Sequence, residues 1–518
     1  MDIIIKYHGD LPGWEVEDLG FGFGIVQTDL ETAAALAALP QVEDVELPRE
    51  LSPTVLTGES SLCLRALRSP LGPGLFGKGT AVGIVDTGVQ YTHPAFRHAD
   101  GSTRILSFWD RTVSPGGREY SAEEINRALF SEDPFAVLPP TDRSGHGTAV
   151  AGIAAGGEEG HFGVAPEASL IVVRVGNASG EYALSTELMR GMKFAVEKAR
   201  SFGLPLSLNL SYGMNEGSHQ GDSLFEEYIN ALSSVWKTVF CVPTGNEGGA
   251  GHHFKGTIRT GETMDVSFFT AEGISRCYLS LWKNFSDRFS CSLLLPGGQD
   301  TGTLREDLPP IQGTFGGVRL TGTFSGPTRY RVSQEVFYGW EGIGESRLIP
   351  PGLWTLRLRA GDIVDGAFHI YLPTVEQVTT GTFFTEPDPY DTMTIPSTAR
   401  RVIKTGALNS RLFAAADFTG TGSTDGVLLP DVAAPGVSVE APSLRGGYDA
   451  FTGTSFASPY TAGAASLLME WGIVRGNDPF LYGERLKAFL QRSAARRNGF
   501  SYPNEIVGYG DLCPSVEP

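Results

Sequence analysis

Strand-like and helix-like segments alternate between residues 80 and 250, and this alternation decides the fold class. The buried-type strand "TAVGIVDTG" is followed by the small-residue helix "HGTAVAGIAAG", and the strand "SLIVVRV" by the amphipathic helix "STELMRGMKFAVEKARSFG". Such pairs predict a parallel sheet with helices on both faces. In an α/β fold of this kind, chemistry is expected at the carboxyl ends of the strands, where the polar loops gather.

The helical pattern disappears between residues 251 and 388. Seven alternating strand segments separated by Gly and Pro turns take its place, from "TMDVSFFT" to "AFHIYLP". They predict an inserted all-β domain of β-sandwich or jelly-roll type. The α/β pattern then returns, so residues 56–250 and 389–518 are expected to form one domain in two parts. A chain of 518 residues is long enough for more than one folded unit.

Residues 1–55 form a third unit, a small α+β leader. "DIIIKY", "FGIVQT" and "VEDVELP" are typical of strands, and "LETAAALAALP" of a short helix. The segment "PRELSPTVLTGESS" that follows has the Pro and Ser content of a linker. A unit this small would be marginally stable alone, so we expect it to need a partner surface.

Composition excludes several classes of partner. The net charge of −19 argues against nucleic acid and anionic membranes, and no stretch has the length of a membrane span. The N-terminus lacks the basic flank and apolar run of a secretory signal peptide. The odd number of scattered cysteines indicates neither a disulfide framework nor a zinc site, which makes a reduced compartment the default expectation. These cysteines are Cys63, Cys241, Cys277, Cys291 and Cys513.

Four polar residues stand where predicted strands or helices begin or end: Asp86, His146, Asn246 and Ser455. Each has an ordinary explanation when taken alone, since Asp and Asn form turns and a serine ahead of a helix is most often its cap. Together they supply what acyl transfer to a serine requires: a nucleophile, a base, a carboxylate that orients the base, and a donor for the oxyanion. The order Asp, His, Ser is one of the known orders of such triads.

The segments "DTGV", "HGTAVAG", "GNEG" and "GTSFASP", with "GVAP", resemble the signatures of the subtilisin-like serine proteases, the subtilase family. The resemblance covers about residues 75–250 and 390–490. It implies a serine endopeptidase in which Ser455 is the nucleophile, His146 the general base and then general acid, and Asp86 the carboxylate that orients the imidazole. Asn246 and the Ser455 backbone N–H would bind the oxyanion. No cofactor is implied.

The resemblance also implies a peptide or protein substrate, held in extended form between two backbone edges. "LSYG", residues 210–213, resembles one edge, and "SGEY", residues 179–182, the other. Glu247 would either favour a basic residue near the scissile bond or face solvent. The residues assigned to substrate binding are Ser179, Gly180, Ser211, Tyr212, Gly213, Thr244 and Gly245.

Several positions depart from the family pattern. Phe456 and the pair Tyr460-Thr461 replace the family's Met and His-Val, which we expect to change flexibility near the site rather than its chemistry. The segment "AAGGEEGHFGVAP" lacks the Asn-rich ligands of the family's calcium loop. Its acidic residues, Glu158 and Glu159, are interpreted as a solvated turn, so no tight metal site is predicted. The neighbouring His252 and His253 are interpreted as loop residues rather than a metal pair.

The long separation of Asn246 and Ser455, the leader without a signal peptide and the segment "GKGTAVGIVDTGVQYTHPAF" are similar to the Csp germination-protease group of spore-forming clostridia. This likeness implies an autoprocessed zymogen whose leader is a chaperone and inhibitor, cleaved by the enzyme itself within residues 51–60, and able to stay bound in the cleft. It further implies a bacterial protein, cytoplasmic or spore-associated, with release by another route left open.

Two alternatives follow from the same residues. In one, the triad is silenced by its bound leader and the chain is a pseudoprotease-like binding or signalling protein in germination-type regulation. In the other, the insertion is the functional surface that recruits a substrate or partner, and the α/β core serves as its scaffold.

Overall fold

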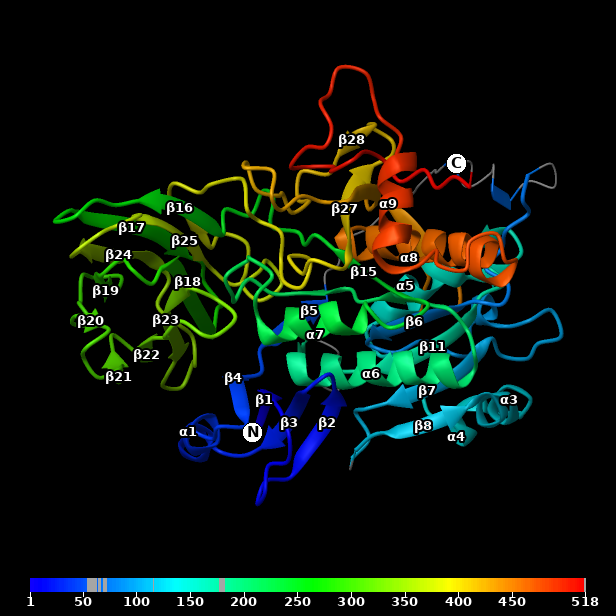
Figure 1. Ribbon diagram of the computed structural model, residues 1–518, viewed down its shortest axis with the longest axis horizontal. Coiled ribbons are helices and arrows are strands. Elements are labelled where there is room, and N and C mark those ends of the chain that lie inside the picture. Colours follow the sequence, from blue (N-terminus) through cyan, green and yellow to red (C-terminus); the bar gives the residue numbers. More distant parts are fainter. Residues whose placement is uncertain (54–62, 64–66, 69–71, 115, 177–181, 517–518) are drawn as a thin grey trace.

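The computed structural model describes residues 1–53, 63, 67–68, 72–114, 116–176 and 182–516 (Figure 1). Its centre is a sheet whose strands follow the order β28-β27-β15-β13-β6-β11-β7-β8, with β29 paired to β27. The inner strands are parallel, and β8 and β28 add antiparallel edges. In chain order the strands are β6 (Ala81–Asp86), β7 (Ile105–Asp110), β8 (Arg118–Ser121), β11 (Ser169–Arg174), β13 (Leu206–Asn209), β15 (Thr238–Pro243), β27 (Ile403–Asn409), β28 (Ala414–Ala415) and β29 (Val432–Pro435).

Helices cover both faces of this sheet, which confirms the predicted fold class (Figure 1). Alternate residues of β6 show the division, because Val82 and Ile84 pack with α5 and α8 whereas Ala81 and Val85 pack with α6 and α7. Every residue of β6 is buried, as is typical of a strand enclosed on two sides. The helices are α5 (His146–Ala155), α6 (Ser185–Ser201), α7 (Leu224–Leu232) and α8 (Thr454–Met469).

The insertion is an all-β lobe beside the core, as predicted (Figure 1). Its two antiparallel sheets have the orders β16-β25-β18-β23-β22-β21 and β20-β19-β24-β17-β26, and their apolar faces enclose one core. Trp354 lies fully buried in that core and stacks on Trp340, with ring centroids 4.9 Å apart. The strands are β16 (His253–Thr257), β17 (Thr263–Thr270), β18 (Arg276–Asn284), β19 (Phe289–Leu294), β20 (Leu304–Arg305), β21 (Ile311–Phe315), β22 (Val318–Phe324), β23 (Ser333–Gly342), β24 (Gly352–Ala360), β25 (Ala367–Tyr371) and β26 (Phe383–Phe384).

The leader folds into a small sheet of order β2-β3-β1-β4 that packs on α6 and α7. Phe23 meets Tyr228 of α7 edge to face, with centroids 5.3 Å apart. Arg190 of α6 binds the carboxylates of Asp2 and Glu17, each at 2.5 Å. The leader thus buries apolar side chains against α6 and α7 of the parallel-sheet core. Its elements are β1 (Asp2–Tyr7), β2 (Val16–Gly20), β3 (Phe23–Gln27), α1 (Leu30–Ala37) and β4 (Val42–Glu46).

One disulfide bond corrects the expectation drawn from the cysteines. Cys63 and Cys513 are joined, although 450 residues separate them in the sequence. Cysteine spacing carries no signal for a bridge of this length, because only the fold brings the two segments together. The other cysteines, Cys241, Cys277 and Cys291, are free and buried.

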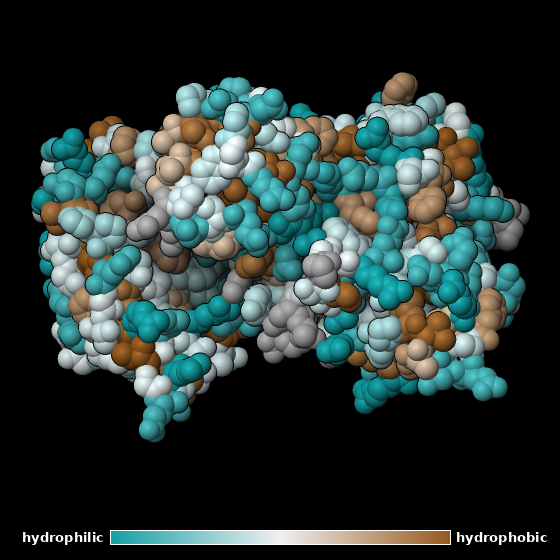
Figure 2. All heavy atoms as spheres, turned by 90° about the horizontal axis from the view of Figure 1, so that it is seen from below, coloured by the Kyte–Doolittle hydropathy of each residue, from teal (hydrophilic) through white to brown (hydrophobic). Residues whose placement is uncertain are grey.

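Hydrophilic side chains cover most of the face seen from below, with apolar residues scattered between them (Figure 2). None of the helices among the described residues has the length and apolar character needed to cross a membrane.

Candidate active site

The imidazole of His146 and the carboxylate of Asp86 form the centre of the site. β6 ends at Asp86 and α5 begins at His146, so both side chains stand where a backbone element ends. His146 Nδ1 lies 2.7 Å from Asp86 Oδ1, and the residues are 3% and 1% exposed. The two segments can approach this closely because residue 147 is glycine: a Cβ there would lie 2.1 Å from the carbonyl oxygen of Gly88. A carboxylate in this position orients the ring and stabilises its protonated form.

Asp142 supports this pair, although its segment carries no recognisable motif. Its Oδ2 accepts hydrogen bonds from the amide and hydroxyl of Thr148, at 3.0 and 2.6 Å, and its Oδ1 accepts from the Thr87 hydroxyl at 3.0 Å. Burial raises the pKa of Asp142. The side chain therefore ties the turn after β6 to the first turn of α5, the two segments that carry Asp86 and His146. The only sequence signal is an acidic residue four positions before His146.

Ser455 stands in the first turn of α8, a helix buried along its whole length. Its Oγ donates to the carbonyl oxygen of Ser211 at 3.4 Å, and the Ser211 hydroxyl donates to the Ser455 carbonyl oxygen at 3.0 Å. The ring of Phe456 lies against the imidazole of His146, with centroids 5.3 Å apart. Phe456 thus fills a packing position beside the site. A hydroxyl in the first turn of a long helix also lies in the positive potential of the helix N-terminus.

Asn246 is held against the same helix end. Its Oδ1 accepts from the backbone N–H and the hydroxyl of Thr454, both at 3.0 Å. Its Nδ2 donates to Glu376 Oε1 of the insertion at 3.1 Å. Because Thr454 precedes Ser455 in the chain, these contacts place the Asn246 amide beside the serine. Asn246 thus lies next to Ser455, and the ring contact between Phe456 and His146 places the His146–Asp86 pair next to the same helix end.

The end of the leader lies in the cleft beside this site. The strand β5 (Glu50–Pro53) runs antiparallel between β12 (Ala183–Leu184) and β14 (Tyr212–Gly213). Leu51 pairs with Ala183 on one side, and Ser52 with Gly213 on the other. The leader strand is thus flanked by one backbone edge on each side.

Of the residues assigned to substrate binding, Tyr212 and Gly213 form one of these edges, and Ser211 contacts Ser455. Ser179 and Gly180 lie outside the described residues. The opposite edge in the described structure is β12, which begins just after the predicted "SGEY" segment.

Thr244 and Gly245, also assigned to substrate binding, lie on the turn after β15 and are buried. The Thr244 hydroxyl is 3.3 Å from that of Thr419, so this side chain faces the protein interior. Gly245 has φ of 90°, and a Cβ there would lie 2.4 Å from Thr394 Cγ2. Glycine is required at this position both by the backbone conformation and by the close approach of Thr394.

Comparison with known proteins identifies the family of this chain. A profile described as the subtilase family matches residues 77–326 and 385–510, which together make up more than two thirds of the chain. The chain belongs to the subtilase family. The structure of the Clostridium perfringens CspB protease is similar, with a TM-score of 0.80 and 36% identity, and the match covers 87% of this chain and 94% of that one. The predicted likeness to the Csp group is thereby confirmed.

Curated relatives are more distant. The PII-type proteinase of Lacticaseibacillus paracasei is 23% identical, over 94% of this chain but only 28% of its own length. The major intracellular serine protease of Bacillus subtilis strain 168 is 33% identical over 180 residues, which are 34% of this chain and 45% of that protein. This subtilase therefore spans less than a third of the length of the lactobacillar proteinase.

Glu247 has neither of the roles expected for it. The side chain is 2% exposed, and its Oε2 lies 2.6 Å from His252 Nδ1 and accepts from Asn215 Nδ2 at 3.2 Å. Its Oε1 accepts from the amide of Val375 at 2.9 Å. The insertion folds back over this residue and removes it from both solvent and substrate, which sequence neighbours alone could not indicate.

His252 lies in a loop, as interpreted, whereas His253 begins β16, which corrects the interpretation for that residue; both are buried. The ring of His252 pairs with the carboxylate of Glu247. The ring of His253 pairs with His369, and its Nε2 lies 2.9 Å from His369 Nδ1. Glu158 accepts from the Tyr448 hydroxyl at 2.7 Å, rather than lying free in a solvated turn. Among the described residues, no group of three or more His, Cys, Asp or Glu side chains is arranged to hold a metal ion.

Proposed function

We propose that this subtilase is a serine endopeptidase that hydrolyses peptide bonds in extended segments of protein substrates. The observation that carries this proposal is the buried contact of 2.7 Å between His146 and Asp86, beside a serine at a helix N-terminus. The antiparallel seat of β5 between β12 and β14 supports an extended peptide as the substrate.

In this mechanism the Ser455 hydroxyl oxygen attacks the carbonyl carbon of the scissile bond, and its proton passes to His146 Nε2. Asp86 stabilises the imidazolium that forms. Asn246 Nδ2 and the Ser455 backbone N–H donate to the oxyanion of the tetrahedral intermediate. The intermediate collapses as His146 protonates the leaving amine, which leaves an acyl-enzyme. Water, deprotonated by His146, then releases the acid product and restores the serine.

The first substrate of this machinery would be its own leader. Tyr212 pairs with Pro53 and Gly213 with Ser52, so a strand that keeps this register presents its next residue opposite Ser211, which contacts Ser455. The residue after Pro53 in the sequence is Thr54, which with Val55 lies outside the described residues. We therefore expect cleavage of the bond between Thr54 and Val55, within the predicted range. The packing of the leader on α6 and α7 would retain it after cleavage.

Self-cleavage is tested by comparing the wild type with Ser455→Ala after purification. We expect two fragments from the wild type, with Val55 as the new N-terminus, and one intact chain from Ser455→Ala. The variant Ser501→Ala, at an exposed serine far along the chain, is the matched control and should process normally. Two fragments from Ser455→Ala would exclude self-processing.

Covalent labelling tests catalysis separately from processing. A fluorophosphonate should modify Ser455 in the folded, processed wild type, and His146→Ala should abolish this labelling because the serine loses its base. Absence of labelling in folded, processed protein would favour the alternative in which the leader silences the site. That alternative draws its support from the presence of β5 in the cleft.

A further inference from the structure

The loop of the insertion between β25 and β26, residues 372–382, closes over the turn that carries the oxyanion-binding asparagine. The amide of Leu372 donates to the carbonyl oxygen of His252 at 3.0 Å, and the amide of Val375 donates to Glu247 Oε1 at 2.9 Å. At its far end the carbonyl oxygen of Thr382 lies 2.9 Å from His252 Nε2. The loop is therefore held by His252, at the start of the insertion, and by Glu247 of the core, next to Asn246.

From this loop Glu376 reaches one of the two donors that would bind the oxyanion, the amide of Asn246. Its Oε1 accepts from Asn246 Nδ2 at 3.1 Å, while the other end of the Asn246 amide is engaged by Thr454. Asn246 is 4% exposed, whereas the side chain of Glu376 keeps contact with solvent. The carboxylate therefore contacts the Asn246 amide from the accessible side.

An ionised carboxylate in this position opposes the reaction in two ways. It accepts one of the two N–H groups that Asn246 can offer, and it places a negative charge next to the place where the oxyanion develops. Like charges a few ångströms apart repel each other, and the buried surroundings of Asn246 reduce the screening by water on that side. Loss of the charge on Glu376 removes the repulsion and weakens the competition for the amide.

We propose that Glu376 is a positioning residue through which the insertion controls Asn246: oxyanion stabilisation is weak while Glu376 is ionised and in contact, and strong when it is neutral or withdrawn. The inference rests on the proposed function. It assigns the insertion a direct part in catalysis, in addition to its structural contacts.

The electrostatic surroundings make this group responsive to pH. The surrounding protein atoms and the charge of Glu247 raise the pKa of Glu376, even though its side chain touches solvent. The other charged group that faces it is His252, whose ring pairs with Glu247. Above its raised pKa, Glu376 is charged and opposes the oxyanion; below that pKa it is neutral. While the loop stays docked on Glu247, activity should therefore fall as the pH rises through the pKa of Glu376.

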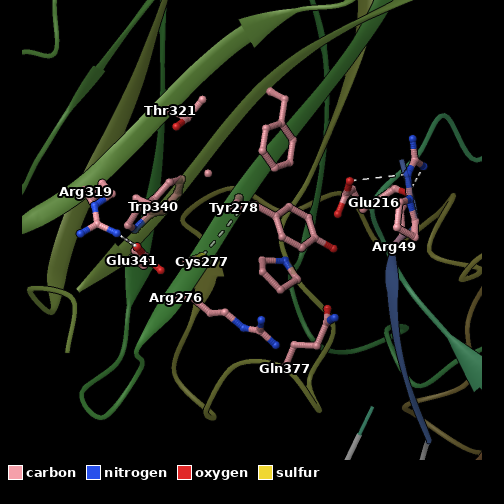
Figure 3. Close-up of a pocket in the computed structure, with 14 residues that line it drawn as sticks. Arg49, Glu216, Arg276, Cys277, Tyr278, Arg319, Thr321, Trp340, Glu341 and Gln377 are labelled. Atoms are coloured by element: carbon pink, nitrogen blue, oxygen red, sulfur yellow. Dashed lines mark hydrogen bonds and ion pairs between the residues drawn. The ribbon is translucent and has the colours of Figure 1, made fainter. Parts of the chain in front are cut away.

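The loop also borders a cavity. Gln377, the next residue, lines a cavity of about 420 Å³ between the leader, the core and the insertion (Figure 3). Arg49 of the leader and Tyr278 of β18 lie on the same cavity, and Arg49 pairs with Glu216 of the core at 3.5 Å. Because its side chain is exposed, Glu376 can turn away from Asn246 while Val378 of the same loop stays packed in the insertion core.

The test compares the rates at which a fluorophosphonate modifies Ser455 in folded, processed protein between about pH 6 and about pH 9. In the wild type we expect this rate to fall toward the alkaline end. Glu376→Gln keeps the shape and removes the charge, so it should react roughly tenfold faster than wild type at the alkaline end and show no such fall. Glu376→Ala should also be faster there. Glu386→Gln, at an exposed carboxylate just after β26, should match the wild type.

The results distinguish a failure of the proposal for Glu376 from a failure of the proposed function. If the wild type is labelled but Glu376→Gln shows the same pH profile, the control by Glu376 is refuted and the proposed function stands. If Glu376→Ala is slower than wild type at every pH, Glu376 supports Asn246 instead of competing for it, and the proposal is again wrong. If Ser455 is labelled in none of the folded variants, the proposed function fails, and the role of Glu376 fails with it.

Discussion

Two segments from outside the parallel-sheet core reach the same cleft, and they hold it by different means. The end of the leader, β5, is paired through its main chain with β12 and β14. The insertion loop, residues 372–382, places one carboxylate on the amide of Asn246. Main-chain pairing tolerates many sequences and ends when the strand leaves, whereas the side-chain contact depends on one group and its charge. We therefore expect the leader to govern access to the cleft and the insertion to govern stabilisation of the oxyanion.

The largest effect is expected when the insertion alone is destabilised, which tests whether the leader and the insertion act independently. Trp354→Ala removes a fully buried side chain, together with its hydrogen bond to the Thr270 hydroxyl at 2.8 Å. We expect the free energy of unfolding of the insertion to fall by about 3–5 kcal/mol. Denaturant titration followed by tryptophan fluorescence measures this. Trp236→Ala, at a side chain that is 61% exposed, should change stability by less than about 0.5 kcal/mol.

If the leader and the insertion act independently, the leader should stay bound to the core in Trp354→Ala. The contacts of the leader with α6 and α7 do not involve the insertion core. Dissociation of the leader in this variant would show that the insertion also holds the leader in place.

Removal of the oxyanion donor tests the different roles of the leader and the insertion through a single residue. Asn246→Ala should lower kcat/KM by about 10²–10³-fold, or about 2.7–4 kcal/mol, a magnitude known for the corresponding donor of subtilisin. Leader affinity should stay the same, because β5 is held by backbone pairing with β12 and β14. Steady-state kinetics on a peptide and a leader-release assay measure the two effects. An equal loss of both would mean that the asparagine shapes the cleft as a whole.

A smaller effect is expected where the leader meets α6. Arg190→Ala removes ion pairs with Asp2 and Glu17, both at 2.5 Å and partly exposed. We expect the leader to bind more weakly by about 1–2 kcal/mol, roughly a tenfold faster release measured by surface plasmon resonance. Arg200→Ala, on an exposed part of the same helix, is the control. Reactivity of Ser455 in leader-free protein should not change, and a loss there would contradict a role confined to the leader.

The sequence places Asp86 and His146 together because the signals there are local. Asp86 and His146 lie at the ends of a strand and a helix whose apolar patterns are unmistakable, and the parallel sheet brings such ends together. The same reasoning misses Glu376, which lies 130 residues from Asn246 and reaches it only through the insertion. It also misses the burial of Glu247, because the covering amide belongs to Val375.

The Cys63–Cys513 bridge is missed for the same reason, since it joins distant segments. Local periodicity and motif spacing report what a segment does by itself. They do not report which side chain a separate domain places against it. The residues that link the insertion to the core are therefore visible only in the structure.

The smallest predicted effect concerns the ion pair that anchors the insertion loop. Both ring nitrogens of His252 face acceptors, Glu247 Oε2 and the Thr382 carbonyl oxygen, so the protonated ring satisfies both. Burial lowers the pKa of His252, but the charge and hydrogen bond of Glu247 outweigh it and raise the pKa above its ordinary value. A raised pKa in the folded protein means that protonation stabilises the docked loop. This stabilisation is complete below the pKa of an unfolded histidine and is lost as the pH rises through the folded value.

Hydrogen exchange of the Val375 amide, which donates to Glu247, reports this docking. Its protection factor, corrected for the intrinsic pH dependence of exchange, should fall as the pH rises through the pKa of His252. In His252→Gln the protection should be lower and independent of pH, whereas His98→Gln, at an exposed histidine, should behave as wild type. A pH-dependent loss in His252→Gln would assign the titration to Glu376 instead. That result would make one carboxylate responsible both for anchoring the loop and for controlling Asn246.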